Sequence, residues 1–347
     1  MPFECPLPVQ DYESVTLGHG GGGRLMQDLI NGVLLPALSN PTLDELHDGA
    51  ILPLNGGGRL ALSTDSFVVD PPFFPGGDIG SLSVHGTAND LAMCGARPLY
   101  LTLSLILEEG FEFERLARVT QSIKRACDEI GVQVLAGDTK VVERGKGDGI
   151  FINTTGIGEV LEGAEISARR IRPGDKLIVS GGLAEHGIAI LSKREGLSFE
   201  SEILSDSAAL WPLVKAALEA AGRGIHALRD ATRGGAAAVL NELAASSACG
   251  VVVDEHAVPV REDVKGACEM LGLDPLYVAN EGKFLAFVSA QRAEQVLEAM
   301  RAHSLGRHAR IIGEAVGEHP GVVRLRTGLG GTRVLDMLSG EQLPRIC

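Results

Sequence analysis

The stretch Arg59-Leu60-Ala61-Leu62-Ser63-Thr64-Asp65-Ser66-Phe67-Val68-Val69 decides the fold, because it is an apolar strand that polar residues interrupt at its centre. A loop rich in proline and glycine covers 70–77. The segments that follow predict a helix over 79–95, a strand over 99–107, a helix over 113–130, and short strands over 132–136 and 149–158 with a polar loop between them. This β-α-β-α-β-β order predicts an α+β sandwich whose helices cover one face of the sheet.

A charged turn over 168–175, with Pro-Gly at its centre, predicts a joint between two domains. Beyond it, patterns predict helices over 184–194, 206–222, 234–247, 261–271 and 291–303, strands over 176–180, 225–229, 250–254, 283–289 and 309–316, and a last strand pair within 322–336. We therefore expect a mixed α+β domain over 1–165, a mixed α/β domain over 166–335 and a flexible tail over 336–347.

The composition is that of a globular protein. The chain has 347 residues, of which 45% are apolar and 22% are charged, and its net charge is −14. Such an acidic balance argues against binding to a nucleic-acid backbone or to an anionic membrane surface. A polyphosphate ligand would therefore need backbone amides, metal ions and a few well-placed cations.

The cysteines favour a reducing compartment. All six are scattered and none forms a Cys-x-x-Cys pair, so neither a zinc site nor a disulfide framework is expected. The first ten residues lack the pattern of a signal peptide, and no apolar run approaches the ~18 residues of a membrane span. We expect a soluble, cytoplasmic protein.

Four acidic residues lie where strands or turns make a carboxylate conspicuous: Asp65, Asp90, Asp138 and Asp230. Asp65 interrupts an apolar strand, where a charge is costly unless it is paired or binds a cation. Taken singly, each could equally be a salt-bridged or solvated carboxylate. Together they predict a hard-metal site, because Mg²⁺ prefers oxygen ligands and often bridges carboxylates to substrate phosphates.

Two glycine-rich segments could hold the phosphates of a nucleotide. Residues 1–14 predict an extended lead-in, and the run that contains Gly20, Gly21 and Gly22 then precedes a helical pattern over 24–38. Backbone N–H groups at such a helix N-terminus can bind phosphate. Thr232-Arg233-Gly234-Gly235 precedes a second helix in the same way and adds a cation. Neither segment is a P-loop, and a plain flexible loop is the alternative.

Three further residues could take part in the chemistry. Lys140 follows Asp138 by two residues and Glu281 precedes an apolar strand, so one could stabilise negative charge and the other could remove a proton; a surface ion pair is the alternative. Cys347 is the last residue of the sequence, where a mobile thiol could carry a covalent group into a distant pocket. An ordinary frayed thiol is the alternative here.

The acidic and glycine-rich segments together resemble a known superfamily. The motifs that carry the resemblance are Gly18–Gly23, Ser63-Thr64-Asp65, Asn89–Ala96, Ala136-Gly137-Asp138-Thr139-Lys140, Asp230–Gly235 and Asn280-Glu281-Gly282. Their order is similar to that in the ATP-binding superfamily of aminoimidazole ribonucleotide synthetase and selenophosphate synthetase. Within it, residues 137–142 and the ending Pro344-Arg345-Ile346-Cys347 resemble the HypE family of hydrogenase maturation factors.

The resemblance implies an architecture and an activity. The N-terminal domain would pair its sheet with that of a second subunit to form a dimeric barrel, and the C-terminal α/β domain would close over ATP. A partner carbamoyltransferase, HypF, would load Cys347 with a carbamoyl group. ATP-dependent dehydration would convert this thiocarboxamide to a thiocyanate. The cyano group would then pass through a HypC–HypD complex to the iron of a [NiFe] hydrogenase.

The resemblance also assigns roles to residues. Asp65, Asp90, Asp138 and Asp230 would hold Mg²⁺ or contact ATP, and Cys347, Lys140 and Glu281 would be catalytic. The remaining nucleotide contacts would be Gly20, Gly21, Gly22, Asn89, Thr139, Thr232, Arg233 and Gly234. Two alternatives remain open at this point: an ATP-dependent phosphotransferase acting on a free small molecule, and a non-catalytic nucleotide-binding scaffold.

Overall fold

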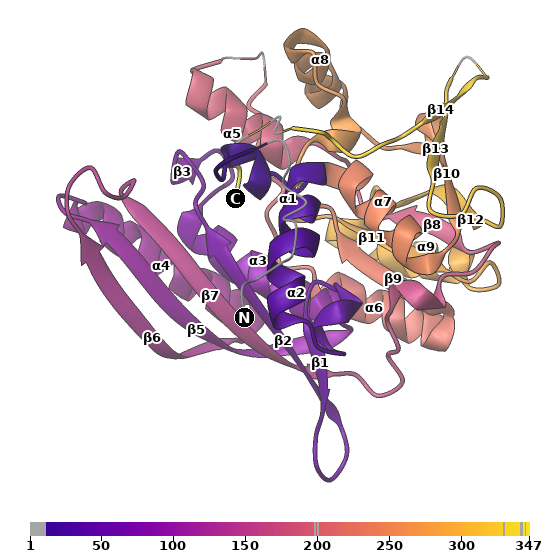
Figure 1. Ribbon diagram of the computed structural model, residues 1–347, viewed down its shortest axis with the longest axis horizontal. Helices are drawn as coiled ribbons and strands as arrows, with labels where there is room; N and C mark the ends of the chain where they lie inside the picture. Colours follow the sequence, from indigo (N-terminus) through magenta and orange to yellow (C-terminus); the bar gives the residue numbers. More distant parts are fainter. Residues whose placement is uncertain (1–11, 198, 200, 329, 341–342, 344) are drawn as a thin grey trace.

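The computed structural model describes residues 12–197, 199, 201–328, 330–340, 343 and 345–347. Most of the lead-in expected over 1–14 lies outside these residues. The expected mixed architecture of two sheets with helices packed on them is confirmed (Figure 1). Among the described residues, no helix has both the length and the apolar character needed to cross a bilayer.

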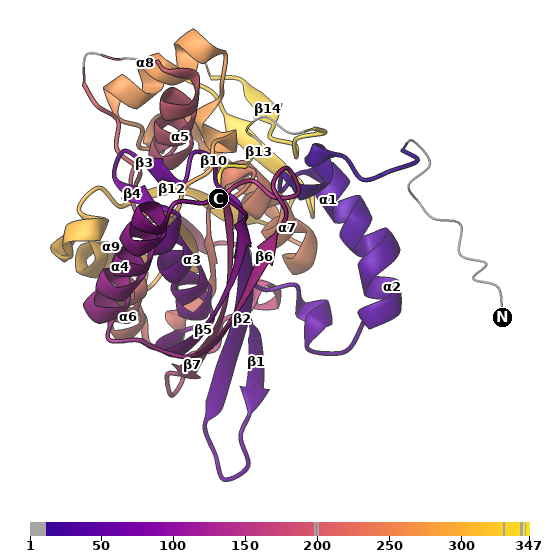
Figure 2. The ribbon, with the colours of Figure 1, turned by 90° about the vertical axis from the view of Figure 1, so that its left-hand side faces the viewer.

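The N-terminal sheet has five strands in the spatial order β1-β2-β7-β5-β6. Their bounds are β1 (Ala50–Pro53), β2 (Arg59–Phe67), β7 (Ile150–Val160), β5 (Ala96–Glu108) and β6 (Gln133–Val142). Helices α3 (Ile79–Met93) and α4 (Phe113–Ile130) cover one face of it (Figure 2). The two-stranded sheet of β3 (Phe73–Phe74) and β4 (Gly77–Asp78) leads into α3, whose first turn the Asp78 carboxylate caps.

The C-terminal sheet has the order β14-β13-β10-β12-β8-β11-β9. Its strands are β8 (Lys176–Val179), β9 (Ile225–Asp230), β10 (Gly250–Asp254), β11 (Phe284–Val288), β12 (Arg310–Val316), β13 (Val323–Arg326) and β14 (Thr332–Val334). Helices α6 (Trp211–Ala221) and α9 (Ala293–Ala302) pack on one face, and α7 (Gly235–Ser247) packs on the other. Helices α5 (Glu185–Glu195) and α8 (Glu262–Leu271) form a separate apolar cluster. Every residue of β11 is buried, as its position between helical layers requires.

The two domains share a core. The end of α3 contributes Leu91, Ala92, Met93 and Cys94 to the cluster formed by α6, α9 and the facing strands of the C-terminal sheet. Helix α3 is therefore buried on nearly all sides, and its apolar and polar residues are not separated onto two faces as in an amphipathic helix. A polar residue on this helix must consequently face either a partner or an internal site.

The helical segment expected over 24–38 is confirmed and contains a π-turn. It comprises α1 (Arg24–Leu29), the π-turn η2 (Ile30–Leu34) and α2 (Leu35–Leu38). Figure 2 shows this segment on the far side of the N-terminal sheet from α3 and α4. Short 3-10 helices lie at Leu17–Gly20, Leu43–Glu45, Ala168–Arg170, Gly222–Gly224, Glu255–Ala257, Pro275–Tyr277 and Ser304–Gly306.

One expected boundary is wrong in a way that affects the site. The strand predicted to end at 136 continues to Val142, so Asp138 lies within β6 and not in the expected polar loop. Strand β6 is at the edge of the sheet and its residues are exposed on both faces up to Val141. Polar residues are tolerated at such an edge, which is why the sequence pattern resembles a loop.

Candidate active site

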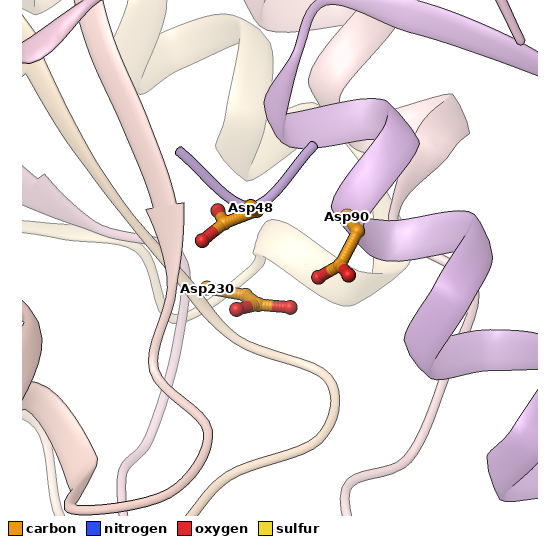
Figure 3. Close-up of side chains that lie close together, drawn as sticks. All are labelled: Asp48, Asp90 and Asp230. Carbon is orange, nitrogen blue, oxygen red and sulfur yellow. The ribbon is translucent and has the colours of Figure 1, made fainter. Parts of the chain in front are cut away.

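Three carboxylates from distant parts of the chain converge between the domains. Oxygen atoms of Asp48, Asp90 and Asp230 all lie within 4.8 Å of one another (Figure 3). Asp48 lies in the turn before β1, Asp90 is in the last turns of α3, and Asp230 ends β9. Because α3 is shared by both cores, the packing of the two domains brings these side chains together.

Burial makes this cluster unfavourable without a cation. Desolvation and the neighbouring carboxylates raise the pKa of Asp90 and of Asp230 well above the ordinary range, and burial raises the pKa of Asp48 to about 6. Arg229 forms ion pairs with Asp48 and, at 2.6 Å, with Glu242. Oδ2 of Asp48 has no hydrogen-bond partner in the described structure. An all-oxygen set with a buried, unpartnered ligand atom fits a hard divalent cation.

Asp65 extends the cluster along β2. Burial raises the pKa of Asp65 above its ordinary value, and a hydrogen bond with Asp90 acts in the opposite direction without cancelling this increase. Two carboxyl groups can share such a bond only when one of them is protonated. Ser63 on the same face donates to Oδ2 of Asp90 at 2.5 Å. Three of the four predicted metal ligands, Asp65, Asp90 and Asp230, are therefore neighbours.

The cluster opens into a cavity of about 460 Å³ that also contains the glycine-rich segments. Gly22, Asp65, Thr232 and Arg233 are among its lining residues. The two glycine segments pack against each other: Gly22 has φ +75°, and a Cβ there would lie 2.6 Å from the carbonyl oxygen of Arg233. Only glycine fits this close approach. Arg233 also donates to the carbonyl of Gly20 at 3.4 Å, while Gly21 and Gly234 line a small neighbouring pocket.

Glu281 is buried at the edge of the same region. Its Oε1 has no hydrogen-bond partner among the described residues, and burial followed by the charge of Asp230 raises its pKa well above the ordinary range. The sequence predicts that Asn89 contacts nucleotide, but in this structure its side chain forms hydrogen bonds with backbone groups. Its amide donates to the carbonyls of Ala208 and Glu281 and accepts from the N–H of Leu210.

The last residues of the chain are docked at this site. The backbone oxygen of Cys347 accepts a hydrogen bond from the N–H of Val68 at 2.9 Å, and Ile346 is buried. Burial raises the pKa of the Cys347 thiol to about 12, against a lowering effect of Arg233. Glu281, Asp65 and Asp230 are the other charges that act on this thiol. The chain end is therefore placed beside the carboxylates and the cationic Arg233.

The remaining predicted residues lie elsewhere in this subunit. In the sheet register Asp65 pairs with Thr154, Thr154 with Leu103, and Leu103 with Gly137. Paired residues share a face, so Asp138 and Lys140 point to the opposite face from Asp65, three strands away. Thr139 is exposed on the same edge strand. The Lys140 and Asp138 side chains form an exposed ion pair at 2.5 Å.

Sequence reasoning missed Asp48. It lies in His47-Asp48-Gly49, directly before β1, a short strand that was itself not expected. The signal that could have found it is a carboxylate followed by glycine in a turn, a context that none of the four selected residues shares. The ring of His186 is buried and contacts the docked tail.

Comparisons with known proteins agree with this arrangement. The N-terminal domain model of the AIR synthase related proteins matches residues 46–160, and the C-terminal domain model matches residues 172–326. The carbamoyl dehydratase HypE of Cupriavidus necator is 54% identical over 345 residues, covering 99% of this chain and 98% of that protein.

Solved structures give the same result. A hydrogenase maturation protein HypE in complex with ATP is 49% identical, with a TM-score of 0.81, and the match covers 96% of this chain and 100% of that one. A HypE–HypF complex contains a chain that is 45% identical with a TM-score of 0.85, covering 89% of this chain and 99% of that one. This chain therefore belongs to the HypE family of carbamoyl dehydratases, within the AIR synthase related proteins.

Proposed function

We propose that this protein uses ATP to remove water from a carbamoyl group carried on the thiol of Cys347. The thiocarboxamide becomes a thiocyanate, and ATP is converted to ADP and phosphate. The observation that carries the proposal is the docked chain end: Cys347 is half-buried, and three of the charged groups that act on its thiol, Arg233, Asp65 and Asp230, line the cavity assigned to nucleotide. The product is the source of the cyanide ligands of the iron in a [NiFe] hydrogenase.

The residues present suit this chemistry. An amide oxygen is a poor leaving group, so it first attacks the γ-phosphoryl group of ATP, and the spreading charge needs cationic stabilisation. Arg233 lines the cavity and acts on the thiol, so its guanidinium can supply this charge. As phosphate leaves, the amide nitrogen must lose its protons. Glu281 is placed to accept one at its unpartnered Oε1, and its raised pKa makes it a stronger base than an ordinary carboxylate.

Magnesium is the cation that we assign to the acidic cluster. Asp48, Asp90 and Asp230, with Asp65 beside them, would hold it, and the bound ion would neutralise charge on the nucleotide phosphates. Asp48 takes the place that sequence reasoning gave to Asp138.

A homodimer accounts for Lys140, Asp138 and Thr139. Asp138 and Lys140 cannot reach the cluster of their own subunit, because they lie on the opposite face of the sheet, and Thr139 is three strands away from it. Strand β6 leaves its outer edge unpaired and exposes Leu135 and Val141 by 61% and 66%. Unpaired apolar edges favour association. We infer that a second copy pairs with this sheet and that the partner subunit's Lys140 completes the site.

Further partners follow from the family. A relative has been solved as a HypE–HypF complex, and we propose that HypF is the carbamoyltransferase that loads Cys347 of this chain. A HypC–HypD complex would receive the cyano group, and the reaction would take place in the cytoplasm. The acidic net charge of −14 fits protein partners and not a nucleic acid.

The test is the mass of the C-terminal peptide. After carbamoylation of the full chain, Mg-ATP is expected to cause the loss of one water from the peptide that ends in Cys347, and Cys347→Ala should abolish both modifications. An unchanged peptide mass in the presence of Mg-ATP would favour a nucleotide-binding scaffold. Transfer of phosphate to a soluble acceptor by the Cys347→Ala variant would favour a phosphotransferase acting on a free small molecule.

A further inference from the structure

The tail tip occupies a groove between the two domains. On one side it pairs antiparallel with the segment after β2: the Val68 N–H donates to the backbone oxygen of Cys347 at 2.9 Å, and the Asp70 N–H donates to the carbonyl of Arg345 at 3.2 Å. Nε of Arg345 returns a bond to the carbonyl of Val68 at 3.1 Å. The chain end is thus bound like an added strand, by main-chain hydrogen bonds.

Helix α5 forms the other side of the groove. His186 and Arg194 are eight residues apart, which places them on one face of the helix. Nε2 of His186 lies 2.8 Å from the carbonyl oxygen of Ile346. Nη2 of Arg194 donates to the carbonyl of Arg345 at 2.8 Å, and Nε donates to the carbonyl of Asp70 at 2.8 Å. Arg194 therefore joins the tail to the segment with which the tail pairs.

The tautomer of His186 is fixed by the tail itself. The carbonyl of Ile346 can only accept, so Nε2, 2.8 Å away, carries the ring proton and donates it. In the neutral ring Nδ1 is then the acceptor, and the hydroxyl of Ser205 donates to it at 2.8 Å. The ring is fully buried, and burial lowers its pKa, which keeps it in this neutral form.

Two apolar side chains of the tail add selectivity. Ile346 is 3% exposed and belongs to the same apolar cluster as Ile190 of α5 and Ala279. Leu343 lies over Gly187: a Cβ at this glycine would come within 3.2 Å of Cδ1 of Leu343. A charged residue at position 346 would have to be buried without a partner, which is costly.

The tail is also fixed at its base. The carbonyl of Leu335 accepts from Asn241, the carbonyl of Asp336 accepts from the hydroxyl of Tyr277, and the carbonyl of Leu338 accepts from the N–H of Arg24. These bonds hold the tail in place as far as Leu338, nine residues before Cys347. Nine extended residues span about 30 Å, which is enough to present Cys347 outside the groove.

We propose that this groove is a sequence-selective binding site for the C-terminal tripeptide Arg345-Ile346-Cys347, with His186 and Arg194 as tail-positioning residues. The inference rests on the proposed function in one respect, that the delivered thiol is the carrier. Its contacts use the backbone of 345–347 and the side chains of Arg345 and Ile346, and none of the hydrogen bonds involves the sulfur. Docking free energy, and not the tether alone, holds the thiol at the site.

The first test measures how often the tail leaves the groove. Alkylation of Cys347 by a maleimide, followed by peptide mass mapping in the full chain without nucleotide, is proportional to the undocked population. Ile346→Asp should raise the rate by more than about 100-fold. His186→Phe, which keeps an aromatic ring beside Phe74 but removes the donor, should raise it about fivefold to tenfold, and His186→Gln should restore part of the loss.

The matched control is Ile346→Val, which keeps an apolar side chain in the groove and should react within about threefold of the parent. Thermal unfolding confirms that each variant is folded. The proposal is overturned if Ile346→Asp reacts at the parental rate, or if the parent already reacts as fast as the free peptide Leu-Pro-Arg-Ile-Cys. Neither measurement involves catalytic turnover, so the groove proposal can be refuted even if the protein dehydrates its carbamoyl group normally.

The second test asks whether the groove binds the peptide in trans. A short tether provides an effective concentration of about 1 mM, so a groove that docks its tail more than about 100-fold must bind the free peptide with a Kd below about 0.01 mM. The full chain carrying Ile346→Asp should bind labelled Leu-Pro-Arg-Ile-Cys in this range, and the parent chain, whose own tail competes, at least tenfold more weakly. No binding to the variant, or equal binding of a peptide with Asp in place of Ile, would refute selectivity.

Discussion

Two groups of acidic residues lie near the N-terminal sheet, one in buried and the other in exposed surroundings. On the face covered by α3, Asp65 lies with Asp48, Asp90 and Asp230 in a buried cluster whose pKa values are raised by desolvation. At the uncovered edge, Asp138 is exposed, and a hydrogen bond from Lys140 lowers its pKa. Aspartate residues thus form a buried cluster of mutually repelling carboxylates in one place and an exposed ion pair with a lysine in the other.

This difference in burial indicates that the buried carboxylates require a cation or protons, whereas the exposed Asp138–Lys140 pair does not. Buried carboxylates that repel one another are stabilised by an ion or by protons. An exposed ion pair is already satisfied by water and contributes little to stability. We infer that the buried cluster needs a cation, whereas the edge pair needs another chain to bring it to the site.

Removing one buried carboxylate should have the largest effect. Asp90→Asn deletes a charge that its neighbours destabilise, so we expect the affinity for Mg-nucleotide to fall by more than about 100-fold while the metal-free protein becomes more stable by about 1–2 kcal/mol. Titration calorimetry and chemical denaturation with a chelator measure the two quantities. Asp128→Asn, at an exposed ion pair with Lys124, is the control and should change neither. Unaltered nucleotide affinity in Asp90→Asn would remove this cluster from the site.

We expect a substitution at the exposed edge of β6 to weaken the association of subunits without destabilising the fold of each subunit. Val141→Asp places a charge on a side chain that is 66% exposed, so the stability of the subunit should change by less than about 0.5 kcal/mol, while dimers dissociate at least tenfold more readily. Light scattering over a concentration series reports the mass. Val334→Asp on β14, where the side chain is 60% exposed, is the matched control. If both variants keep the parental mass, β6 is not the edge that pairs.

The smallest effect is a pH dependence in which the two groups differ in sign. Burial raises the folded-state pKa of Asp48 to about 6, so the folded state binds the extra proton, and the metal-free protein should lose stability as pH rises from about 4 to 6. Asp138, with its lowered pKa, contributes stability that is lost as pH falls. Urea midpoints across this range should decline with pH, less so in Asp48→Asn and in excess Mg²⁺. A slope that Asp48→Asn leaves unchanged would assign the effect to other groups.

Much of the fold could be predicted because its signals are local. The helix over 113–130 was predicted with the bounds of α4, since an amphipathic stripe and a following glycine define both ends. The end of β6 was missed, because an edge strand solvated on both faces lacks the alternation that marks a half-buried strand. The short strand β1, and with it Asp48, was missed because four residues hold too little pattern.

The sequence alone determined the order of helices and strands, the family and most of the carboxylates, since these depend on residue type and spacing along the chain. Tertiary structure decided which carboxylates meet, because a shift of one residue in a strand moves a side chain to the opposite face: Asp65 joins the cluster, while Asp138 does not. It also decided that the last three residues occupy a groove between two domains. That contact depends on α5 and on the segment after β2, which no local pattern relates to the chain end.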